Sequence, residues 1–253
     1  MSPLISIIVT TYLAESKIYL DACIKSIFNL DYDNFEVILV GRPSYQPIYD
    51  KVKTVVFPKD DFGNSEGINY GVKHASPNAA AYFILNDDVI LTKDSLGELV
   101  AVGADMIVGP ISNCDQGIKY YLMGAFDVAT QFRLNQGAEP SAVAETINLL
   151  SNKRSPYPRG LIIQTHLYFY AVYIPKMVWD KLGSFGEQYK TGPDDLDYSR
   201  RAQHAGVRMG IVLSSLVWHA SGATADKTIT PELRESNAKA WKETWGDDQP
   251  FSL

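Results

Sequence analysis

The chain has 253 residues, of which 46% are hydrophobic and 21% are charged, as in ordinary globular proteins with one large or two small domains. Its net charge of −6 and isoelectric point near 5.2 argue against nucleic acid or an anionic membrane as the main partner. No apolar run approaches the ~18 residues of a transmembrane segment, and the N-terminus lacks the positive flank of a signal peptide.

The two cysteines, Cys23 and Cys114, have no spacing that suggests a disulfide framework. A reducing compartment is the default for such a chain, so we expect a cytoplasmic location. Cys23 falls in an apolar stretch with helical spacing, which predicts a buried thiol.

The first half of the chain alternates strand and helix signals. Strands are predicted at Leu4–Thr10, Phe35–Val40, Thr54–Phe57, Ala81–Leu85 and Asp105–Val108, and helices at Glu15–Leu30 and Asn64–Ala75. This alternation is typical of an α/β fold whose mostly parallel central sheet is flanked by helices. Ligands of such folds bind beyond the carboxyl ends of the strands.

The second half is less regular, and no linker or repeat separates it from the first. Helices are predicted at Gly137–Ser151, Pro175–Leu182, Asp194–Ala205 and Pro231–Trp245, and strands at Leu161–Ile174, Val207–Leu213 and Leu216–His219. We expect a single domain over 1–253, with a nucleotide-binding half at about 1–110 and an acceptor-binding, catalytic half at about 111–253.

Three segments contain residues suited to catalysis or metal binding. Asn86-Asp87-Asp88 ends a predicted strand, and paired carboxylates there suit Mg²⁺ or Mn²⁺, although a solvated turn or helix cap would have the same sequence. Asp194, Asp195 and Asp197 open a predicted helix, where acids either favour the helix dipole or supply a general base. His219 ends an apolar strand, and it becomes a metal ligand only if the fold brings it near Asp88.

A fourth segment, Gly63–Ala75, begins a predicted helix with small and amide residues. Gly67 permits close backbone approach, Asn64 and Asn69 supply amide side chains, and a helix N-terminus favours a diphosphate or a ribose. A capped helix packed tightly on the sheet would have the same composition.

Taken in order, these segments resemble the inverting glycosyltransferases of family two, which have the GT-A fold. SIIVTTY resembles the first strand of that family, and LNDDV resembles its D-x-D motif with Asn86 in the first position. PDDLDYSRR resembles the segment that supplies the catalytic base, and VWHASG resembles the late strand whose histidine completes the metal site in some members. The resemblance spans roughly residues 4–222 and implies a hexosyltransferase, with polysaccharide biosynthesis as the process.

The resemblance also implies a role for individual residues. Asp195 would be the catalytic base, with Asp194 and Asp197 as alternatives, and Asp88 and His219 would hold Mn²⁺ or Mg²⁺. The nucleotide-binding residues would be Thr10, Thr11, Tyr12, Gly41, Arg42, Asn64, Gly67, Asn69, Asn86 and Asp87. The partners would be a nucleotide-sugar donor and a glycan or another hydroxyl acceptor.

The chain departs from the family pattern in two respects. Gly41-Arg42-Pro43 follows the second strand, where the family usually has an acid that binds uracil, so we expect Arg42 beside the base or the ribose. Uridine diphosphate is the expected nucleotide from family frequency alone. The chain also ends soon after the late strand, as expected of a near-minimal catalytic domain.

Two other functions compete with this interpretation. A nucleotidyltransferase that forms nucleotide-sugars would have a glycine-rich, basic loop after the first strand, whereas Thr10–Glu15 has neither glycine nor a basic residue. An inactive nucleotide- or sugar-binding module would have lost its acids, whereas Asp88 and Asp195 are present. The sequence leaves the acceptor and the oligomeric state open.

Overall fold

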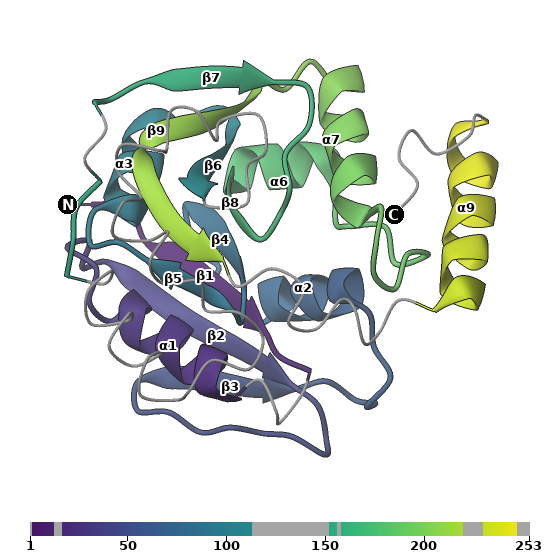
Figure 1. Ribbon diagram of the computed structural model, residues 1–253, viewed down its shortest axis with the longest axis horizontal. Coiled ribbons are helices and arrows are strands. Elements are labelled where there is room, and N and C mark those ends of the chain that lie inside the picture. Colours follow the sequence, from purple (N-terminus) through teal and green to yellow (C-terminus); the bar gives the residue numbers. More distant parts are fainter. Residues whose placement is uncertain (1, 13–16, 113–151, 156–157, 220–229, 247–253) are drawn as a thin grey trace.

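A computed structural model of the protein describes residues 2–12, 17–112, 152–155, 158–219 and 230–246 (Figure 1). The predicted helix at Gly137–Ser151 and the second cysteine, Cys114, lie outside these residues. The described strands form one nine-stranded sheet, in which eight follow the order β3-β2-β1-β4-β8-β6-β9-β5 and β7 pairs with β9.

One half of the sheet is parallel, as the alternating pattern predicts. Its strands are β1 (Ile5–Thr10), β2 (Phe35–Gly41), β3 (Val52–Val56) and β4 (Ala81–Asn86). All three neighbouring pairs among them are parallel. Every residue of β1 is buried, which explains its continuous apolar run, because a strand covered on both faces needs no polar alternation.

The other half of the sheet mixes parallel and antiparallel pairs. Its strands are β5 (Val89–Leu91), β6 (Ile107–Ser112), β7 (Leu161–Gln164), β8 (Ala171–Pro175) and β9 (Met209–His219). The single strand predicted at Leu161–Ile174 divides into β7 and β8. The two strands predicted before and after Ser214-Ser215 form one continuous strand, whose pairing with β6 shifts register at that point.

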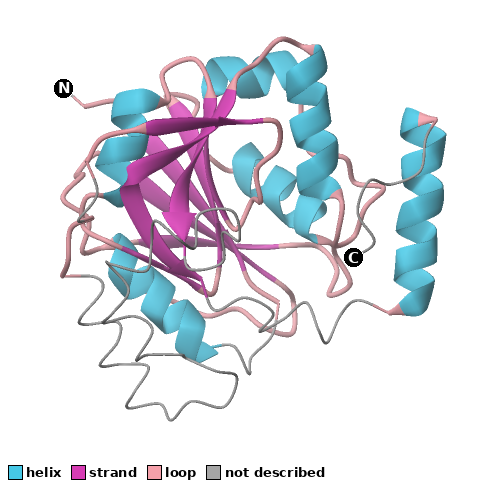
Figure 2. Cartoon of the chain, turned by 45° about the horizontal axis from the view of Figure 1, so that its top comes forward, coloured by secondary structure: helices cyan, strands magenta, loops and turns pink. Residues whose placement is uncertain are grey.

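Helices cover both faces of the sheet (Figure 2). They are α1 (Lys17–Ile27), α2 (Asn64–Lys73), α3 (Ser95–Val102), α6 (Lys176–Leu182), α7 (Asp194–His204) and α9 (Pro231–Trp245). The buried residues of α1 and α3 join one apolar cluster, and those of α2, α6 and α7 join the other. Cys23 lies fully buried on α1, as its apolar surroundings predict.

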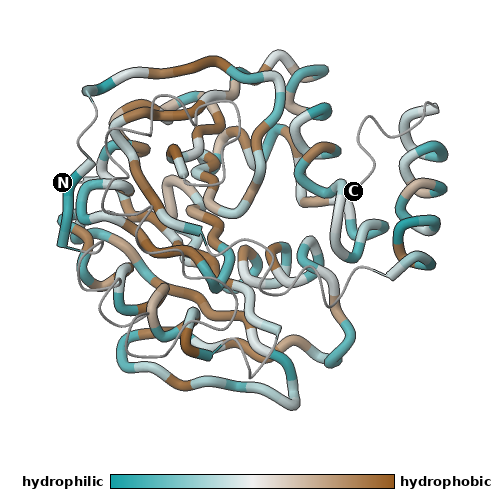
Figure 3. Tube along the Cα trace, viewed as in Figure 1, coloured by the Kyte–Doolittle hydropathy of each residue, from teal (hydrophilic) through white to brown (hydrophobic). Residues whose placement is uncertain are grey.

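Hydrophobic residues are concentrated along the strands of the sheet (Figure 3). The helix α9 stands apart from the sheet and lies beside α7 (Figure 1). Its residues Trp241 and Trp245 form a small apolar cluster with Leu196 of α7. Among the described residues, no helix is long and apolar enough to cross a membrane.

Candidate active site

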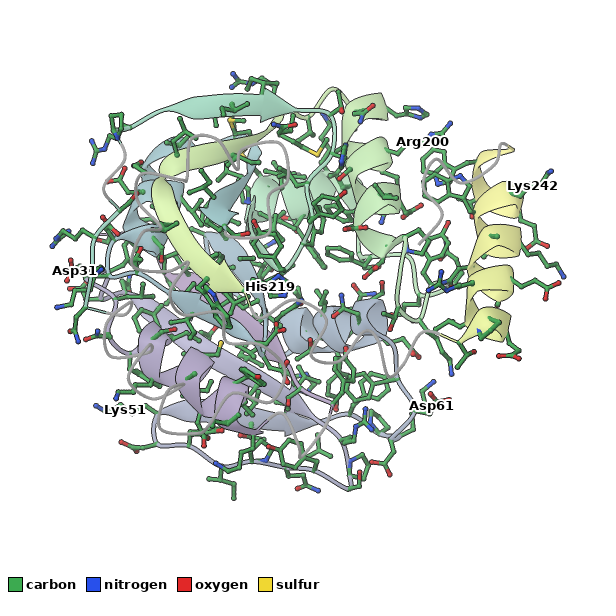
Figure 4. All side chains as sticks on the ribbon, viewed as in Figure 1. Asp31, Lys51, Asp61, Arg200, His219 and Lys242 are labelled. Atoms are coloured by element: carbon green, nitrogen blue, oxygen red, sulfur yellow. The ribbon has the colours of Figure 1, made fainter. Side chains whose placement is uncertain are left out.

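The sheet topology brings the ends of several strands to one edge. Strands β1, β2 and β4 are parallel, and β8 runs antiparallel to β4. Because β6 is antiparallel to β8 and β9 is parallel to β6, β9 ends at the same edge as β4. His219, the last residue of β9, therefore lies beside the acids that follow β4, and Figure 4 places it at the centre of the molecule.

Asp88 and His219 make direct contact at this edge. The Nε2 atom of His219 lies 3.1 Å from Oδ1 of Asp88, and both side chains are largely buried. The pairing of β5 with the end of β9 fixes this contact, because Val89 lies opposite His219 in the ladder. The imidazole also stacks on the Tyr170 ring, with the centroids 4.8 Å apart.

Asn86 and Asp87 are held from two directions. The buried Thr11 hydroxyl donates a 2.7 Å hydrogen bond to Asp87, which ties the end of β1 to the end of β4. The backbone N–H of Asn86 donates to the carbonyl oxygen of Tyr170 at 2.9 Å, while the Asn86 side chain is partly exposed. Asn86 and Asp87 are thus tied to the residues that follow β1 and precede β8.

Asn64, the first residue of α2, links the predicted nucleotide-binding segment to the acids of α7. Its side-chain oxygen accepts hydrogen bonds from the hydroxyls of Thr10 and Tyr12, both at 3.4 Å. Its side-chain amide donates to Asp194 at 3.0 Å. The preceding residue is glycine, and a Cβ atom there would lie 2.3 Å from the Lys190 carbonyl oxygen, so only glycine lets this loop approach α2.

The three acids of α7 have different environments. Asp194 is buried and accepts hydrogen bonds from Asn64 and Ser65. Asp197 is buried on another side of the helix, where it pairs with Arg201 at 3.0 Å and accepts from the Trp245 indole at 3.0 Å. Asp197 therefore joins α7 to α9.

Asp195 differs from both neighbouring acids because it is partly exposed. Its carboxylate accepts backbone hydrogen bonds from Leu196 and from Phe169. Desolvation, followed by the negative charge of Asp194, raises the pKa of Asp195 well above its ordinary range. Burial also raises the pKa of Asp194, but hydrogen bonds from Asn64 and Ser65 oppose that rise. Asp195 therefore differs from Asp194 in its partners, because its carboxylate is bound by backbone N–H groups and not by the side chains of α2.

The adjacent residues Phe169 and Tyr170 connect the separate parts of the site. The backbone of Phe169 binds Asp195, the ring of Tyr170 stacks on His219, and the Tyr170 carbonyl binds Asn86. In the sequence, these two residues stand out only as members of the aromatic segment Tyr168–Tyr173, which could form apolar platforms for sugar rings. The aromatic run just before β8 is visible in the sequence, but it does not reveal which residue each ring contacts.

Arg42 lies in an aromatic environment beyond the carboxyl end of β2. Its guanidinium is 5.5 Å from the ring centroid of Tyr12 and 5.8 Å from that of Phe62. The buried Nε atom has no hydrogen-bond partner among the residues that the structure describes. A Cβ atom on Gly41 would lie 2.7 Å from the carbonyl oxygen of Tyr45, so the glycine allows the turn that positions Arg42.

Two residues predicted to contact the nucleotide, Asn69 and Gly67, have close contacts within the protein. Asn69 is buried, and its side chain exchanges three hydrogen bonds with Phe185 and Glu187. A Cβ atom on Gly67 would lie 2.7 Å from the Phe62 ring and 3.0 Å from Thr10, so this glycine permits close packing of α2. Both residues position the loops around the site.

The chain is similar to known proteins in both sequence and structure. The family model described as glycosyltransferase like family 2 matches residues 3–238. The structure of S. aureus TarS residues 1–349 with UDP-GlcNAc is similar, with a TM-score of 0.58 and 14% identity, covering 97% of this chain and 67% of that one. That of GalNAc-T7 with UDP, GalNAc and Mn²⁺ has a TM-score of 0.57 and 9% identity, covering 86% and 44%.

Among curated protein sequences, none matches the chain significantly. The structural neighbours have low sequence identity, so they establish the fold, and the family model establishes the family. The chain belongs to glycosyltransferase family 2 and is a glycosyltransferase with the GT-A fold.

Proposed function

We propose that this enzyme transfers a hexose from a UDP-sugar to a hydroxyl group of a glycan acceptor, with inversion at the anomeric carbon. The observation that carries the proposal is the convergence of Asp88, His219 and Asp195 around the Phe169-Tyr170 segment. A carboxylate–imidazole pair and a separate basic carboxylate are the groups that a metal-assisted displacement requires.

The nucleotide would bind at the carboxyl ends of β1 and β2. Tyr12 and Arg42 would contact the base, and Asn64 and Asn86 would lie near the ribose and the diphosphate. Gly41 would support these contacts by allowing the turn that positions Arg42. Thr10 would support them through its hydrogen bond to Asn64. Two structural neighbours were crystallised with UDP or a UDP-sugar, which favours uridine over other bases.

The residues present fit a divalent cation. The two protein ligands would be Asp88 and His219. Among the described residues, no cluster of three or more acids, histidines or cysteines is arranged to bind a metal. Mg²⁺ and Mn²⁺ sites that use one or two protein ligands take the remaining oxygens from substrate phosphates and water. Once bound, the ion would neutralise negative charge on the departing diphosphate. Asp87, fixed by Thr11, would add negative charge nearby.

Asp195 would take the proton from the acceptor hydroxyl. The acceptor oxygen then bonds to the anomeric carbon as the bond between that carbon and the diphosphate oxygen breaks. A single in-line displacement inverts the anomeric centre. The raised pKa of Asp195 suits this role, because a base is most effective when its pKa approaches the working pH.

Donor hydrolysis tests the proposal without knowledge of the acceptor. The protein is incubated with UDP-, GDP- and TDP-sugars and Mn²⁺, and free nucleotide diphosphate is measured. We expect slow hydrolysis of a UDP-hexose by the wild type, and loss of hydrolysis in Asp88→Asn. Asp105→Asn is the matched control. Asp105 is an exposed acid that pairs with Arg208 and precedes β6, so it lies at the edge of the sheet opposite to Asp88.

Hydrolysis of no nucleotide-sugar at all would contradict the proposal and favour an inactive binding module. Formation of a nucleotide-sugar from a nucleoside triphosphate and a sugar phosphate would favour the nucleotidyltransferase alternative.

A further inference from the structure

The loop between β3 and α2 is bonded to the turn that follows β2. Its residue Asp60 accepts two hydrogen bonds at Oδ1, from the backbone N–H of Ser44 at 2.9 Å and from the Ser44 hydroxyl at 2.6 Å. Ser44 belongs to the turn that Arg42 and Tyr45 close by two backbone hydrogen bonds. The Asp60 carboxylate is therefore fixed on the same turn that carries Arg42.

The same loop supplies an aromatic ring beside the residues proposed to contact the base. The ring centroid of the buried Phe62 lies 4.9 Å from that of Tyr12, and the guanidinium of Arg42 lies over both rings. The Phe62 backbone N–H donates to the Asp60 carbonyl oxygen at 3.2 Å. Asp60 is thus tied to both sides of this cluster, through Phe62 and through the turn of Arg42.

The Asp60 carboxylate is ionised and has one oxygen to offer. Hydrogen bonds from Ser44, and to a smaller extent the positive charge of Arg42, lower the pKa of Asp60 below its ordinary range. Within the described part of the chain, all hydrogen bonds to this carboxylate go to Oδ1, and no ion pair joins it to Arg42. Asp60 is exposed, so its Oδ2 atom is accessible to a ligand.

Contacts on both sides of Asp60 hold the loop in place. Lys59 pairs with Glu66 of α2 at 2.9 Å, and Glu66 also accepts a hydrogen bond from the Gly63 N–H at 2.8 Å. Asp61 pairs with Lys190 at 2.6 Å. A side chain on a loop that is already ordered loses less conformational entropy when it binds a ligand.

The chemistry of uracil requires an acceptor as well as a donor. The pairing edge of uracil has an N–H donor at N3 between two carbonyl oxygens, whereas cytosine has an acceptor nitrogen at N3. An ionised carboxylate only accepts hydrogen bonds, and a guanidinium only donates them. A carboxylate that faces N3 therefore binds uracil and repels cytosine, and Arg42 alone cannot bind N3–H.

We propose that Asp60 determines the specificity of the donor site for uracil, by accepting the N3–H group while Arg42 donates to a neighbouring carbonyl oxygen of the base. The inference rests on the proposed function, because it assumes a uridine nucleotide. It extends that function by assigning base recognition to an acid that none of the sequence motifs includes. The two charged side chains come from two loops, and Ser44 joins them.

The affinities of UDP and CDP, measured by calorimetry in the presence of Mn²⁺, test the inference. We expect the wild type to bind UDP more tightly than CDP. In Asp60→Asn, the ratio of the UDP affinity to the CDP affinity should fall by about tenfold or more, the effect of losing a hydrogen bond to a charged group. Asn keeps a side-chain oxygen for Ser44. Because the ratio compares two ligands on one variant, partial unfolding would lower both affinities and leave the ratio unchanged.

The chain offers a matched control in the next residue. Asp61→Asn removes the same charge from the same loop, but Asp61 pairs with Lys190, its side chain is 83% exposed, and it lies at the periphery of the molecule in Figure 4. Asp61→Asn should keep the ratio of the wild type. Asp60→Glu keeps a carboxylate at the position and should retain part of the preference for UDP.

The inference is overturned if Asp60→Asn keeps the wild-type ratio, or if the wild type binds CDP as tightly as UDP. An equal fall of the ratio in Asp61→Asn would also overturn it, because the effect would then come from the charge of the loop. Hydrolysis of a UDP-hexose by the wild type, combined with an unchanged ratio in Asp60→Asn, refutes this inference alone. Absence of hydrolysis in the wild type refutes the proposed function instead.

Discussion

The ring of Tyr170 lies nearly parallel to the imidazole of His219, with the centroids 4.8 Å apart and an angle of 21° between the planes. The same residue accepts a backbone hydrogen bond from Asn86 and donates its hydroxyl to the Pro110 carbonyl at 3.3 Å. Tyr170 thereby fixes His219 relative to the end of β4. It is a positioning residue for the proposed metal ligands, since side chains that orient ligands influence metal affinity.

Replacing Tyr170 separates the effect of its ring from that of its hydroxyl. Tyr170→Phe keeps the stacked ring and should bind Mn²⁺ in the presence of UDP as the wild type does. Tyr170→Ala leaves His219 unsupported, and we expect a loss of about 10–100-fold in Mn²⁺ affinity. Calorimetry at a temperature where both variants are folded provides the measurement. Equal Mn²⁺ affinity in the two variants would show that the ring does not position His219.

Local sequence patterns predict the parallel half of the sheet and the helices around it. The β-branched run of β1 and the helical spacing of α1 carry this information within single segments. The short strand β5 escapes prediction because three residues are too few to show a period. The division of the second aromatic segment into β7 and β8 also escapes it, because the tertiary contacts of the intervening loop interrupt the pairing.

The candidate site is predictable from the sequence only as a set of separate motifs. Nothing local indicates that Asn64 donates to Asp194, since 130 residues separate them. The different environments of Asp195 and Asp197 depend on α9, whose Trp245 binds the second acid. The positioning role of Tyr170 depends on a histidine 49 residues later, so only the tertiary structure reveals it.

Binding of the nucleotide diphosphate should require a divalent cation. The proposed site supplies negative charge through Asp87 and Asp88, so a diphosphate without a cation would be repelled. We expect UDP affinity, measured by calorimetry, to fall by at least about tenfold in excess chelator or in Asp88→Asn. Asp105→Asn should bind UDP and Mn²⁺ normally. Equal UDP affinity with and without chelator would exclude the metal role of Asp88 and His219.

Arg42 should determine which base the enzyme accepts. Its guanidinium lies over the rings of Tyr12 and Phe62, and its buried Nε atom has no hydrogen-bond partner within the described part of the chain. We expect Arg42→Ala to lower the affinity for UDP by about 10–100-fold, the effect of losing a hydrogen bond from a charged group, and to change the ranking of UDP, GDP and TDP. Arg42→Lys keeps the charge without the planar guanidinium and should be intermediate. An unchanged ranking in Arg42→Ala would leave Arg42 with a structural role only.

The last prediction concerns Asp195, for which activity and stability should change in opposite directions. Asp195→Asn preserves the shape of the side chain and removes its basicity, so kcat should fall by about 10²–10⁴-fold. The dissociation constant of the nucleotide should be nearly unchanged, because the base acts in the transition state. In the wild type, kcat should fall as the pH is lowered through the raised pKa of Asp195, because the protonated acid accepts no proton.

The same raised pKa determines how stability depends on pH. An unfolded Asp has a pKa near 3.9, so between about pH 4 and the raised pKa the folded chain binds more protons than the unfolded chain. The contribution of Asp195 to the free energy of unfolding therefore declines as the pH rises through this window. Asn cannot ionise, so Asp195→Asn should be more stable than the wild type at pH 8, and this difference should shrink as the pH approaches 4.

Asp197→Asn is the matched control, because the same substitution two residues later breaks the buried pair with Arg201. It should lower the free energy of unfolding by about 3–5 kcal/mol and retain most of kcat when measured well below its melting temperature. Thermal unfolding across pH and steady-state kinetics on the identified donor provide both readouts. If Asp194→Asn or Asp197→Asn loses turnover while Asp195→Asn keeps it, the base is assigned to the wrong acid of α7. If all three variants retain turnover, the proton is taken by a group outside α7.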